Sequence, residues 1–445
     1  MDNKTIYALS TLFGKSGIAV IRVSGKNAFA VIEKMTEIDA ANLISRKMYF
    51  TQIFDAVSRE TLDNALVVAF KNPQSFTGED TVEINCHGSK AVIRSVLASL
   101  AKLPDFRLAE AGEFSRRAFY NGKMDLTKAE GLADLIDAET ALQRKVALQQ
   151  MGGTLLNLYE NWRERLLSTL SYIEAYIDFP EENIPHNTVV KIENSVFKIM
   201  DEIERHITDN NIEERLRDGF RVVIAGEPNA GKSSLINAIV KRNVAIVSDV
   251  AGTTRDVIDA YVDLRGFPVV FSDTAGLRDG GDEVERIGIE LAKEKIMSAD
   301  FKIFIFDAKK GCPHGITPYL NDNEYLLVAN KSDTLSEDEI EELSHYDYVL
   351  ASAKKNVNID IITDKIYEHF KELYVQGSSG VITRQRYKEA LQECVENLQR
   401  FNLRKEIELA AEDIRLACRA IGKITGKVEV NEVLDKIFSN FCIGK

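Results

Sequence analysis

The sequence predicts a multidomain protein with an α+β N-terminal domain, a discontinuous α-helical domain and an inserted α/β domain built on a mostly parallel sheet. Its length of 445 residues is too great for one ordinary core and indicates about three domains. The hydrophobic pattern also changes along the chain, from mixed strands and helices to helices alone and then to alternating strands and helices.

The domain boundaries are expected where the pattern changes. We expect the α+β domain in residues 1–118, the helical domain in residues 119–216 and 378–445, and the inserted α/β domain in residues 217–377. The flexible composition of Gly377-Ser-Ser-Gly380 marks the return from the insert to the helical domain.

Short runs of β-branched and aromatic residues between turn residues predict strands in both sheet-containing domains. In the N-terminal domain these runs cover Ile6–Leu9, Gly17–Val23, Ala65–Phe70 and Thr81–Asn85. In the α/β domain they cover Arg221–Ala225, Val269–Ser272, Phe301–Phe306, Tyr325–Ala329 and Tyr348–Ala351.

Helical periodicity defines the middle of the chain. The pattern of Thr127 and Glu130 resembles a capping box and predicts the start of a long helical stretch. Apolar residues at spacings of three and four then indicate amphipathic helices that need partners. These residues are Leu155, Tyr159, Trp162, Leu166, Leu170, Ile173 and Ile177, then Ile192, Val196, Ile199, Ile203 and Ile207, and finally Tyr387, Leu391, Cys394, Leu398 and Phe401. Phe179-Pro180 is expected to end the first of them.

Composition limits the partners and the compartment. The formal net charge of −13 argues against non-specific wrapping of nucleic acid, although Arg116, Arg117 and Lys123 leave either a local basic site or a solvated helix surface open. No apolar run approaches the ~18 residues of a membrane span, and the N-terminus lacks a signal-peptide pattern. Five scattered cysteines without a C-x-x-C pair favour a reducing cytoplasm: Cys86, Cys312, Cys394, Cys418 and Cys442.

A phosphate-binding loop is predicted at Gly226-Glu-Pro-Asn-Ala-Gly-Lys-Ser233, because the motif directly follows an apolar strand and opens a helix. Its glycines let backbone N–H groups turn inward, and the helix N-terminus attracts negative charge. We expect Lys232 to reach the β- and γ-phosphates and the Ser233 hydroxyl to bind Mg²⁺.

Asn330-Lys-Ser-Asp333 predicts the base, because it follows a strand at the right place in the alternation. The Asp333 carboxylate can accept from the adjacent N1–H and 2-amino donors of guanine, whereas adenine would leave it unpaired. Ser352-Ala-Lys354, just past the next strand, is placed to support the base through backbone N–H groups.

Two further segments complete the expected site. Thr254 offers a second Mg²⁺-binding hydroxyl, Asp273 can hold a Mg²⁺-bound water, and the Gly276 N–H can contact the γ-phosphate. Leu277 stands where many small GTPases have a water-orienting glutamine, so a carboxylate from the acidic stretch Asp279 to Glu285 is one substitute and a merely solvated loop is the other.

Together these motifs resemble the bacterial tRNA-modification GTPase family MnmE (TrmE) over the whole chain. The most specific markers are Ile21-Arg-Val-Ser-Gly25, Ser75-Phe-Thr-Gly-Glu-Asp80, Gly112-Glu-Phe-Ser115, Asp273-Thr-Ala-Gly-Leu-Arg278, Val284-Glu-Arg-Ile-Gly288 and Phe441-Cys-Ile-Gly-Lys445. The resemblance implies GTP hydrolysis that serves, with the flavoprotein MnmG, the addition of a carboxymethylaminomethyl-type group to C5 of the wobble uridine (position 34) of certain tRNAs.

The resemblance also implies a homodimer whose G domains meet in a potassium-dependent way. The implied K⁺ positions are Asn229, Ser248, Val250 and Thr253, and the implied water-orienting residue is Glu285. Arg255 and Arg278 are secondary candidates for phosphate or dimer contacts, or are surface charges. The full set expected to bind GTP is Asn229, Ala230, Gly231, Lys232, Ser233, Ser234, Ser248, Thr253, Thr254, Asp273, Gly276, Asn330, Lys331, Asp333, Ser352, Ala353 and Lys354.

For the N-terminal domain the resemblance implies dimerisation and the binding of 5-formyl-tetrahydrofolate or another one-carbon tetrahydrofolate. The matching positions are Arg22, Glu83, Lys123 and Lys445. Cys442 has a chemical role near that pocket or serves packing. The early loop Thr11–Gly17 departs from the glycine- and proline-rich family pattern, which affects the shape of the first turn.

Two other classes of GTPase remain as alternatives. A ribosome-assembly or regulatory GTPase would have a similar G domain, but such proteins usually carry an RNA-binding appendage after the G domain or a second G domain. A membrane-remodelling GTPase is disfavoured because no basic amphipathic helix or lipidation signal is evident.

Overall fold

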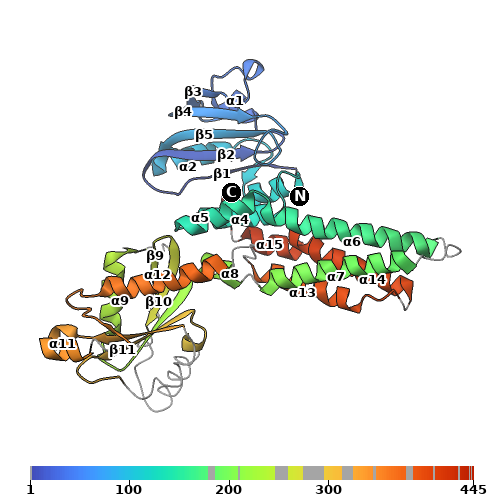
Figure 1. Ribbon diagram of the computed structural model, residues 1–445. Coiled ribbons are helices and arrows are strands. Elements are labelled where there is room, and N and C mark those ends of the chain that lie inside the picture. The colour runs from blue at the N-terminus through green and yellow to red at the C-terminus, as the bar shows by residue number, and fades with distance from the viewer. Residues whose placement is uncertain are drawn as a thin grey trace, which may run out of the picture. The chain divides into compact units, whose positions relative to one another are not determined.

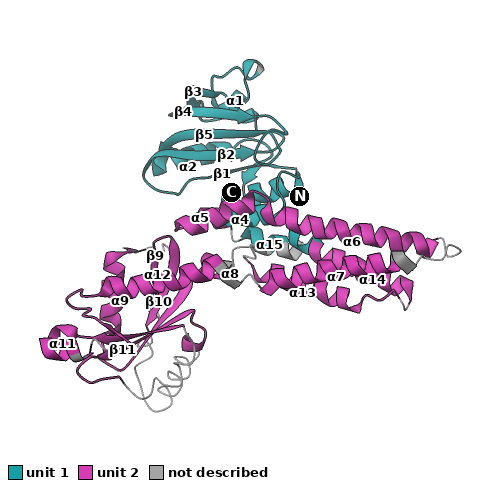
Figure 2. Ribbon diagram, in the orientation of Figure 1, with its two compact units in different colours: residues 1–133, 422–445 teal, residues 134–421 magenta. Residues whose placement is uncertain are grey.

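The computed structural model describes residues 3–178, 186–208, 211–245, 259–273, 295–312, 324–343, 347–376, 384–403, 406–428, 431–439, 441 and 443–444. The chain divides into two compact units, residues 1–133 with 422–445 and residues 134–421 (Figure 2). The boundaries expected at residues 118, 216 and 377 stay a prediction.

A six-stranded mixed sheet forms the centre of the first unit, as expected for an α+β domain (Figure 1). Its strands in spatial order are β3 (Met48–Phe54), β4 (Thr61–Phe70), β5 (Thr81–Gly88), β2 (Ser16–Ser24), β1 (Thr5–Leu9) and β6 (Phe106–Leu108). Helices α1 (Ala30–Met35) and α2 (Lys90–Leu100) bury Ile32 and Ile93 against the alternate, inward residues of the strands, with a 3-10 turn at Ala40–Asn42. The four predicted strands are confirmed.

Three helices complete this unit: α3 (Glu113–Tyr120), the first part of α4 (Leu126–Asp137) and α15 (Asn431–Ser439). The capping box expected at Thr127 is wrong, because Asp125 caps α4 by accepting from the backbone N–H groups of Thr127 and Lys128 at 2.9 and 3.2 Å. A true capping box joins Thr140 and Gln143 at the start of α5 (Ala141–Met151). The helical stretch is therefore broken into successive helices.

The helical part of the second unit contains α6 (Thr154–Asp178), α7 (His186–Thr208), α13 (Gln385–Arg400) and most of α14 (Ile407–Thr425). Helices α7 and α13 pack side by side although the whole α/β insert separates them in sequence (Figure 1). The periodic stripes are confirmed, because Trp162, Ile199 and Leu391 are almost fully buried. Phe179-Pro180 lies outside the described residues.

A seven-stranded sheet forms the α/β part of this unit. Its order is β13 (Val349–Leu350), β12 (Tyr325–Asn330), β11 (Phe301–Asp307), β7 (Phe220–Ala225), β10 (Phe267–Asp273), β9 (Asp259–Leu264) and β8 (Val244–Ala245). The five strands from β13 to β10 pair in parallel, as expected, whereas β9 and β8 form an antiparallel edge. The helices described with it are α8 (Asn211–Asp218), α9 (Lys232–Arg242), α11 (Glu337–Leu343) and α12 (Ile359–Gln376), with a 3-10 turn at Ser332–Thr334.

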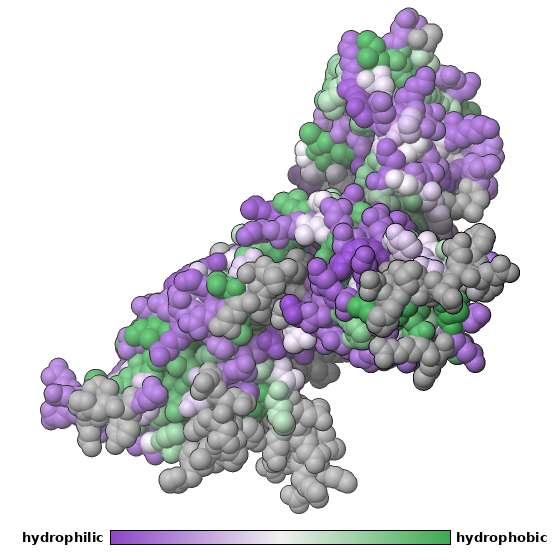
Figure 3. All heavy atoms as spheres, turned by 45° about the vertical axis from the view of Figure 1, so that its right-hand side comes forward, coloured by the Kyte–Doolittle hydropathy of each residue, from purple (hydrophilic) through white to green (hydrophobic). Residues whose placement is uncertain are grey.

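The surface of the described residues carries both polar and apolar side chains. On the face drawn in Figure 3, hydrophilic residues predominate and hydrophobic residues lie in separate patches. None of the helices that the structure describes combines the length and the apolar character needed to span a bilayer.

Candidate functional site

A cavity of about 790 Å³ lies at the carboxyl ends of the parallel strands of the second unit. It is lined from three loops, which follow β7, β12 and β13, because parallel strands bring their carboxyl ends to one edge of a sheet. The lining residues are Gly226, Pro228, Asn229, Gly231, Lys232, Ser233, Ser234, Asn330, Lys331, Asp333, Thr334, Ser352, Ala353 and Lys354. The structure therefore brings together most of the described residues that the sequence assigned to GTP.

Two glycines in the loop after β7 are required by close neighbours. A Cβ atom on Gly226 would lie 2.1 Å from the Ile305 carbonyl oxygen of the adjacent strand β11. Gly231 has a φ of +103°, and a Cβ atom there would lie 2.2 Å from the side-chain nitrogen of Asn330. Because α9 begins at Lys232, the loop presents a helix N-terminus to the cavity.

Lys232 and Ser233 have the geometry of a phosphate and cation site. The buried Lys232 ammonium donates to the carbonyl oxygens of Gly226 and Glu227 at 2.9 and 3.0 Å, so it is held within the loop. Ser233 Oγ donates to Asp273 Oδ2 at 2.8 Å. A hydroxyl and a carboxylate are ligands that hard cations such as Mg²⁺ prefer, so the residues present fit that ion.

Asn330 connects the loops rather than simply lining the cavity. Its side-chain amide donates to the Ala230 carbonyl at 2.7 Å and accepts from the Ala353 N–H at 3.0 Å. Since the Asn330 side chain is 3 % exposed, its bond to Ala230 is shielded from water, whereas the bond from the half-buried Ala353 is partly shielded. The loops that follow β7, β12 and β13 are thus joined by one amide.

At the other end of the cavity, Asp333 is held by Ser352. The fully buried Ser352 hydroxyl donates to Asp333 Oδ1 at 2.6 Å and accepts from the Lys355 N–H at 3.1 Å. These contacts orient the carboxylate that the sequence assigned to guanine.

The sequence did not predict a role for Asp307, whose Oδ2 lies 2.8 Å from Lys331 Nζ. A charged residue at the end of a buried strand was a signal that could have indicated it.

The remaining nucleotide and cation positions expected from the sequence fall outside the described residues. They are Ser248, Val250, Thr253, Thr254, Arg255, Gly276, Leu277, Arg278 and Glu285. Cys442 and Lys445, expected near the folate pocket, also lie outside them.

In the first unit, Arg22 and Glu83 form an ion pair across β2 and β5. Arg22 Nε lies 2.8 Å from Glu83 Oε1, and the two side chains are about one-fifth exposed. The Arg22 guanidinium lies 5.3 Å from the ring centroid of Phe76 and 5.8 Å from that of Phe114. This places a paired charge beside two aromatic rings, of which Phe114 is fully buried and Phe76 is half-buried.

Lys123 lies against the loop that carries Phe76. Its ammonium donates to the Pro73 carbonyl at 2.8 Å, and its stem would contact a Cβ atom on Gly78. The C-terminal tail returns to the same sheet, because Ser10 Oγ donates to the Gly444 carbonyl at 2.9 Å. The described candidates for the folate site therefore share one unit.

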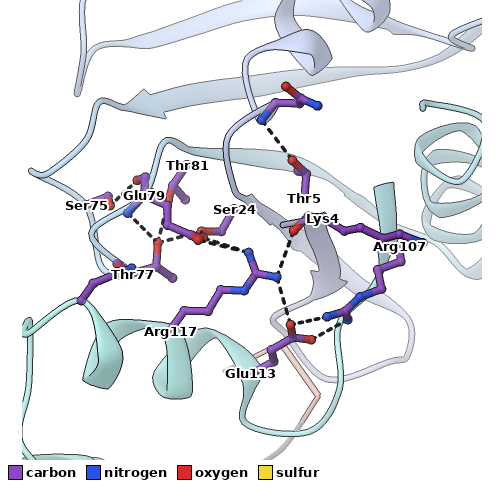
Figure 4. Close-up of polar contacts among 12 residues, drawn as sticks. Lys4, Thr5, Ser24, Ser75, Thr77, Glu79, Thr81, Arg107, Glu113 and Arg117 are labelled. Carbon is purple, nitrogen blue, oxygen red and sulfur yellow. Dashed lines mark hydrogen bonds and ion pairs between the residues drawn. The ribbon is translucent and has the colours of Figure 1, made fainter. Parts of the chain in front are cut away.

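A buried ion network fixes this region, and it corrects the expectation for Arg117 (Figure 4). Arg117 belongs neither to a solvated surface nor to an open basic site, because it is 3 % exposed. Its guanidinium lies 3.1 Å from Glu79 and 3.0 Å from Glu113, and it donates to the Lys4 carbonyl at 2.9 Å. Arg107 makes two further hydrogen bonds to Glu113, at 2.6 and 2.7 Å.

The network also keeps Glu113 ionised. Burial alone would raise the pKa of Glu113, but hydrogen bonds from Arg107, the Glu110 N–H and Arg117 outweigh it and lower that pKa. Loop 75–80 and α3 are tied together by the Arg117–Glu79 pair, and they bring Phe76 and Phe114 next to Arg22.

The described cysteines are not prepared as nucleophiles. Burial raises the pKa of Cys86 and of Cys418 to about 11, and it raises the pKa of Cys394 further. Among the described residues, no cluster of three or more His, Cys, Asp or Glu side chains could hold a metal ion.

Two family models match the chain. The model described as the GTP-binding protein TrmE N-terminus matches residues 5–123, and the MnmE helical domain model matches residues 126–442. Among solved structures, Era of Aquifex aeolicus bound to GDP and AlF4⁻ is 26% identical, with a TM-score of 0.28, and the match covers 40% of this chain and 66% of that one.

Curated relatives match over the full length. The tRNA modification GTPase MnmE of Rickettsia canadensis (strain McKiel) is 44% identical over 447 residues, which cover 99% of this chain and 100% of the relative. That of Wolbachia sp. subsp. Brugia malayi (strain TRS) is 43% identical over 445 residues, with 100% and 99% covered. The chain therefore belongs to the MnmE family of tRNA modification GTPases.

Proposed function

We propose that this GTPase acts with the flavoprotein MnmG to add a carboxymethylaminomethyl-type group to C5 of the wobble uridine (position 34) of certain tRNAs. The observation that carries the proposal is the cavity that joins the phosphate loop to Asp333, in a chain that matches a tRNA-modification family from end to end. We propose the cytoplasm as the compartment, since the described cysteines are free thiols.

Each end of the cavity has a proposed role. The guanine base lies against Asp333, whose carboxylate accepts from N1–H and the 2-amino group while Ser352 holds it in place. The triphosphate lies on the N–H groups at the start of α9, where Lys232 exchanges its carbonyl partners for phosphate oxygens. Mg²⁺ bound near Ser233 and Asp273 would neutralise charge on the phosphates.

Hydrolysis itself is proposed to need residues outside the described parts of the chain. Thr254 and Gly276 would order around the γ-phosphate, and Glu285 would orient the attacking water in place of the glutamine that Leu277 replaces. K⁺ held near Asn229 would stabilise developing negative charge, and the homodimer would form as the G domains close on it.

In the first unit we propose a site for a one-carbon tetrahydrofolate. Glu83 would accept from the adjacent amide N–H and amino groups of the pterin while its ion pair with Arg22 holds it in place, and Lys123 would pair with the glutamate tail. The half-buried ring of Phe76 offers a face for the pterin, whereas Phe114 is fully buried behind it in the core. The folate would supply the carbon that the tRNA reaction consumes.

Mass spectrometry of tRNA nucleosides tests the proposed function directly. A strain that lacks the protein should lose the modified wobble uridine, and the wild-type gene should restore it. The Asp333→Asn variant should not restore it, because an amide nitrogen would face the guanine donors. Normal wobble uridines in the deleted strain, with defective ribosome assembly instead, would overturn the proposal in favour of the ribosome-assembly alternative.

A further inference from the structure

Asp307 is a carboxylate next to the nucleotide cavity that has no role in the function described above. It ends strand β11 and does not line the cavity, but its Oδ2 lies 2.8 Å from Nζ of Lys331, which does. The two side chains are 18 % and 37 % exposed, so the pair sits at the rim of the site.

The backbone fixes the direction of the Asp307 carboxylate. Strands β11 and β12 are parallel, and Asp307 stands opposite Asn330, the residue before Lys331. Its Oδ1 accepts from the Lys309 N–H at 3.1 Å, and the Ala308 N–H donates to the Asn330 carbonyl at 2.9 Å. The remaining oxygen, Oδ2, is therefore presented to Lys331.

Lys331 is held at both ends. Its backbone has a φ of +66°, a left-handed conformation from which the 3-10 turn Ser332–Thr334 begins. Its ammonium is anchored by Asp307 and the residue lines the cavity, so the four-carbon stem is fixed at the backbone and at the ammonium. A free lysine side chain samples many rotamers, and anchoring the ammonium removes most of that freedom before a ligand arrives.

We propose that Asp307 is a positioning residue for the nucleotide base. By holding the Lys331 ammonium, it keeps the apolar stem flat as a face against which the purine ring packs, and it does so without touching the ligand. The inference rests on the proposed placement of guanine beside Asp333, which is a neighbour of Lys331 in the same loop. It predicts an effect on the base half of the nucleotide and none on the phosphate half.

If the ion pair had no role in binding, its removal would leave the affinity for the nucleotide unchanged. Exposed pairs also contribute little to folding, so removing this one should leave the stability of the domain nearly unchanged in either case. If the pair acts on ligand binding, its removal leaves the lysine stem free, so the stem must lose conformational entropy when the ligand binds. That entropy corresponds to a loss of about 2- to 13-fold in affinity.

The Asp307→Asn variant separates these roles. Asparagine keeps an oxygen for the Lys309 N–H but cannot form the ion pair with Lys331. Titration calorimetry on the full chain should show GDP binding weakened by about 2- to 13-fold, with binding of inorganic tripolyphosphate unchanged. The matched control Asp338→Asn removes the same charge from an exposed position on α11 and should change neither.

A double-mutant cycle adds an independent readout. Lys331→Met keeps an unbranched stem but removes the ammonium, so Asp307→Asn should have no further effect on GDP binding in that background. Unchanged GDP binding in Asp307→Asn, an equal loss for tripolyphosphate, or full additivity in the cycle would each overturn the inference. A separate titration of Asp333→Asn compares its affinities for GDP and for xanthosine diphosphate, whose base has a carbonyl in place of the 2-amino group. This titration tests the placement of guanine beside Asp333, so a failure of that placement is distinguished from a failure of the inference about Asp307.

Discussion

Truncating Asn330 to alanine should uncouple the loop that follows β7 from the loop that follows β13. The side chain is 3 % exposed and bridges the Ala230 carbonyl and the Ala353 N–H at 2.7 and 3.0 Å. Alanine removes both bonds at once and leaves two backbone groups to find new partners. The two loops then lose the amide that connects them across the cavity.

The size of the effect follows from the burial of the two backbone groups. Ala230 is 2 % exposed, so its orphaned carbonyl should cost about 1–3 kcal/mol. Ala353 is only half-buried, so water can satisfy its N–H and the cost there should be about 0.5–1.5 kcal/mol. The local loss of about 1.5–4.5 kcal/mol is a large share of the roughly 5–15 kcal/mol that stabilises a domain.

Hydrogen exchange measured by mass spectrometry is the suitable assay, because a multidomain chain does not unfold in two states. A local loss of about 2 kcal/mol should speed exchange of the affected amides roughly 30-fold. The change should be confined to residues 226–236 and 350–356. Asn243→Ala is a matched control, since the hydrogen bond described for its side chain is local, from Asn243 Nδ2 to the Ile239 carbonyl at 2.9 Å.

Two outcomes of the exchange experiment would contradict this prediction. Unchanged protection in both loops would mean that Asn330 does not join them, whatever the distances are. Protection lost evenly across the chain, including the first unit, would mean that the variant unfolds globally and that the local argument is wrong.

Two further predictions concern matched pairs of positions. Gly226→Ala should abolish nucleotide binding and lower the thermal midpoint, because the new Cβ would meet the Ile305 carbonyl at 2.1 Å, whereas Gly14→Ala, with no atom within 4 Å, should change neither in calorimetry. Arg117→Met should cost about 3–5 kcal/mol in the hydrogen-exchange protection of the first unit, because it removes the ion-pair partner of Glu79 and leaves the buried Glu113 with Arg107 alone. Arg116→Met, whose partner Asp435 is largely exposed, should cost at most about 1 kcal/mol, and equal costs at the two arginines would contradict the burial argument.

Strands were predictable where the sequence carries a continuous apolar run. Strands β7, β10, β11 and β12 are buried on both faces, so each one is a short hydrophobic segment in the sequence. Such a segment can be predicted as a strand without knowing which strands it pairs with. Strand β9 was missed because Asp259–Leu264 has no continuous apolar run, and it pairs with β10 on one side and with the two-residue edge strand β8 on the other. Strands of this kind are specified by their partners more than by their own residues.

Local motifs competed in ways that the sequence does not resolve. Thr127 and Glu130 fit the capping-box pattern, but Asp125 stands two residues earlier and caps the helix instead. Arg117 gave no sign of burial, because its partner Glu79 lies 38 residues away along the chain. Such contacts arise only when β2, loop 75–80 and α3 are packed together.

The nucleotide motifs gave the chemistry of each loop but not the connections between loops. Gly231 fits the phosphate-loop pattern, yet the atom that excludes a side chain there is the amide nitrogen of Asn330, which would lie 2.2 Å from a Cβ atom. Asn330 is almost 100 positions further along the chain, so the motif alone does not show this contact. Asn330 in turn needs the Ala353 N–H from a third loop. The glycine is therefore required by the loop that follows β12 as well as by its own left-handed backbone conformation. Because the loops share one hydrogen-bonded amide, substitutions at Gly231 and Asn330 should be strongly non-additive, as expected for residues within one network.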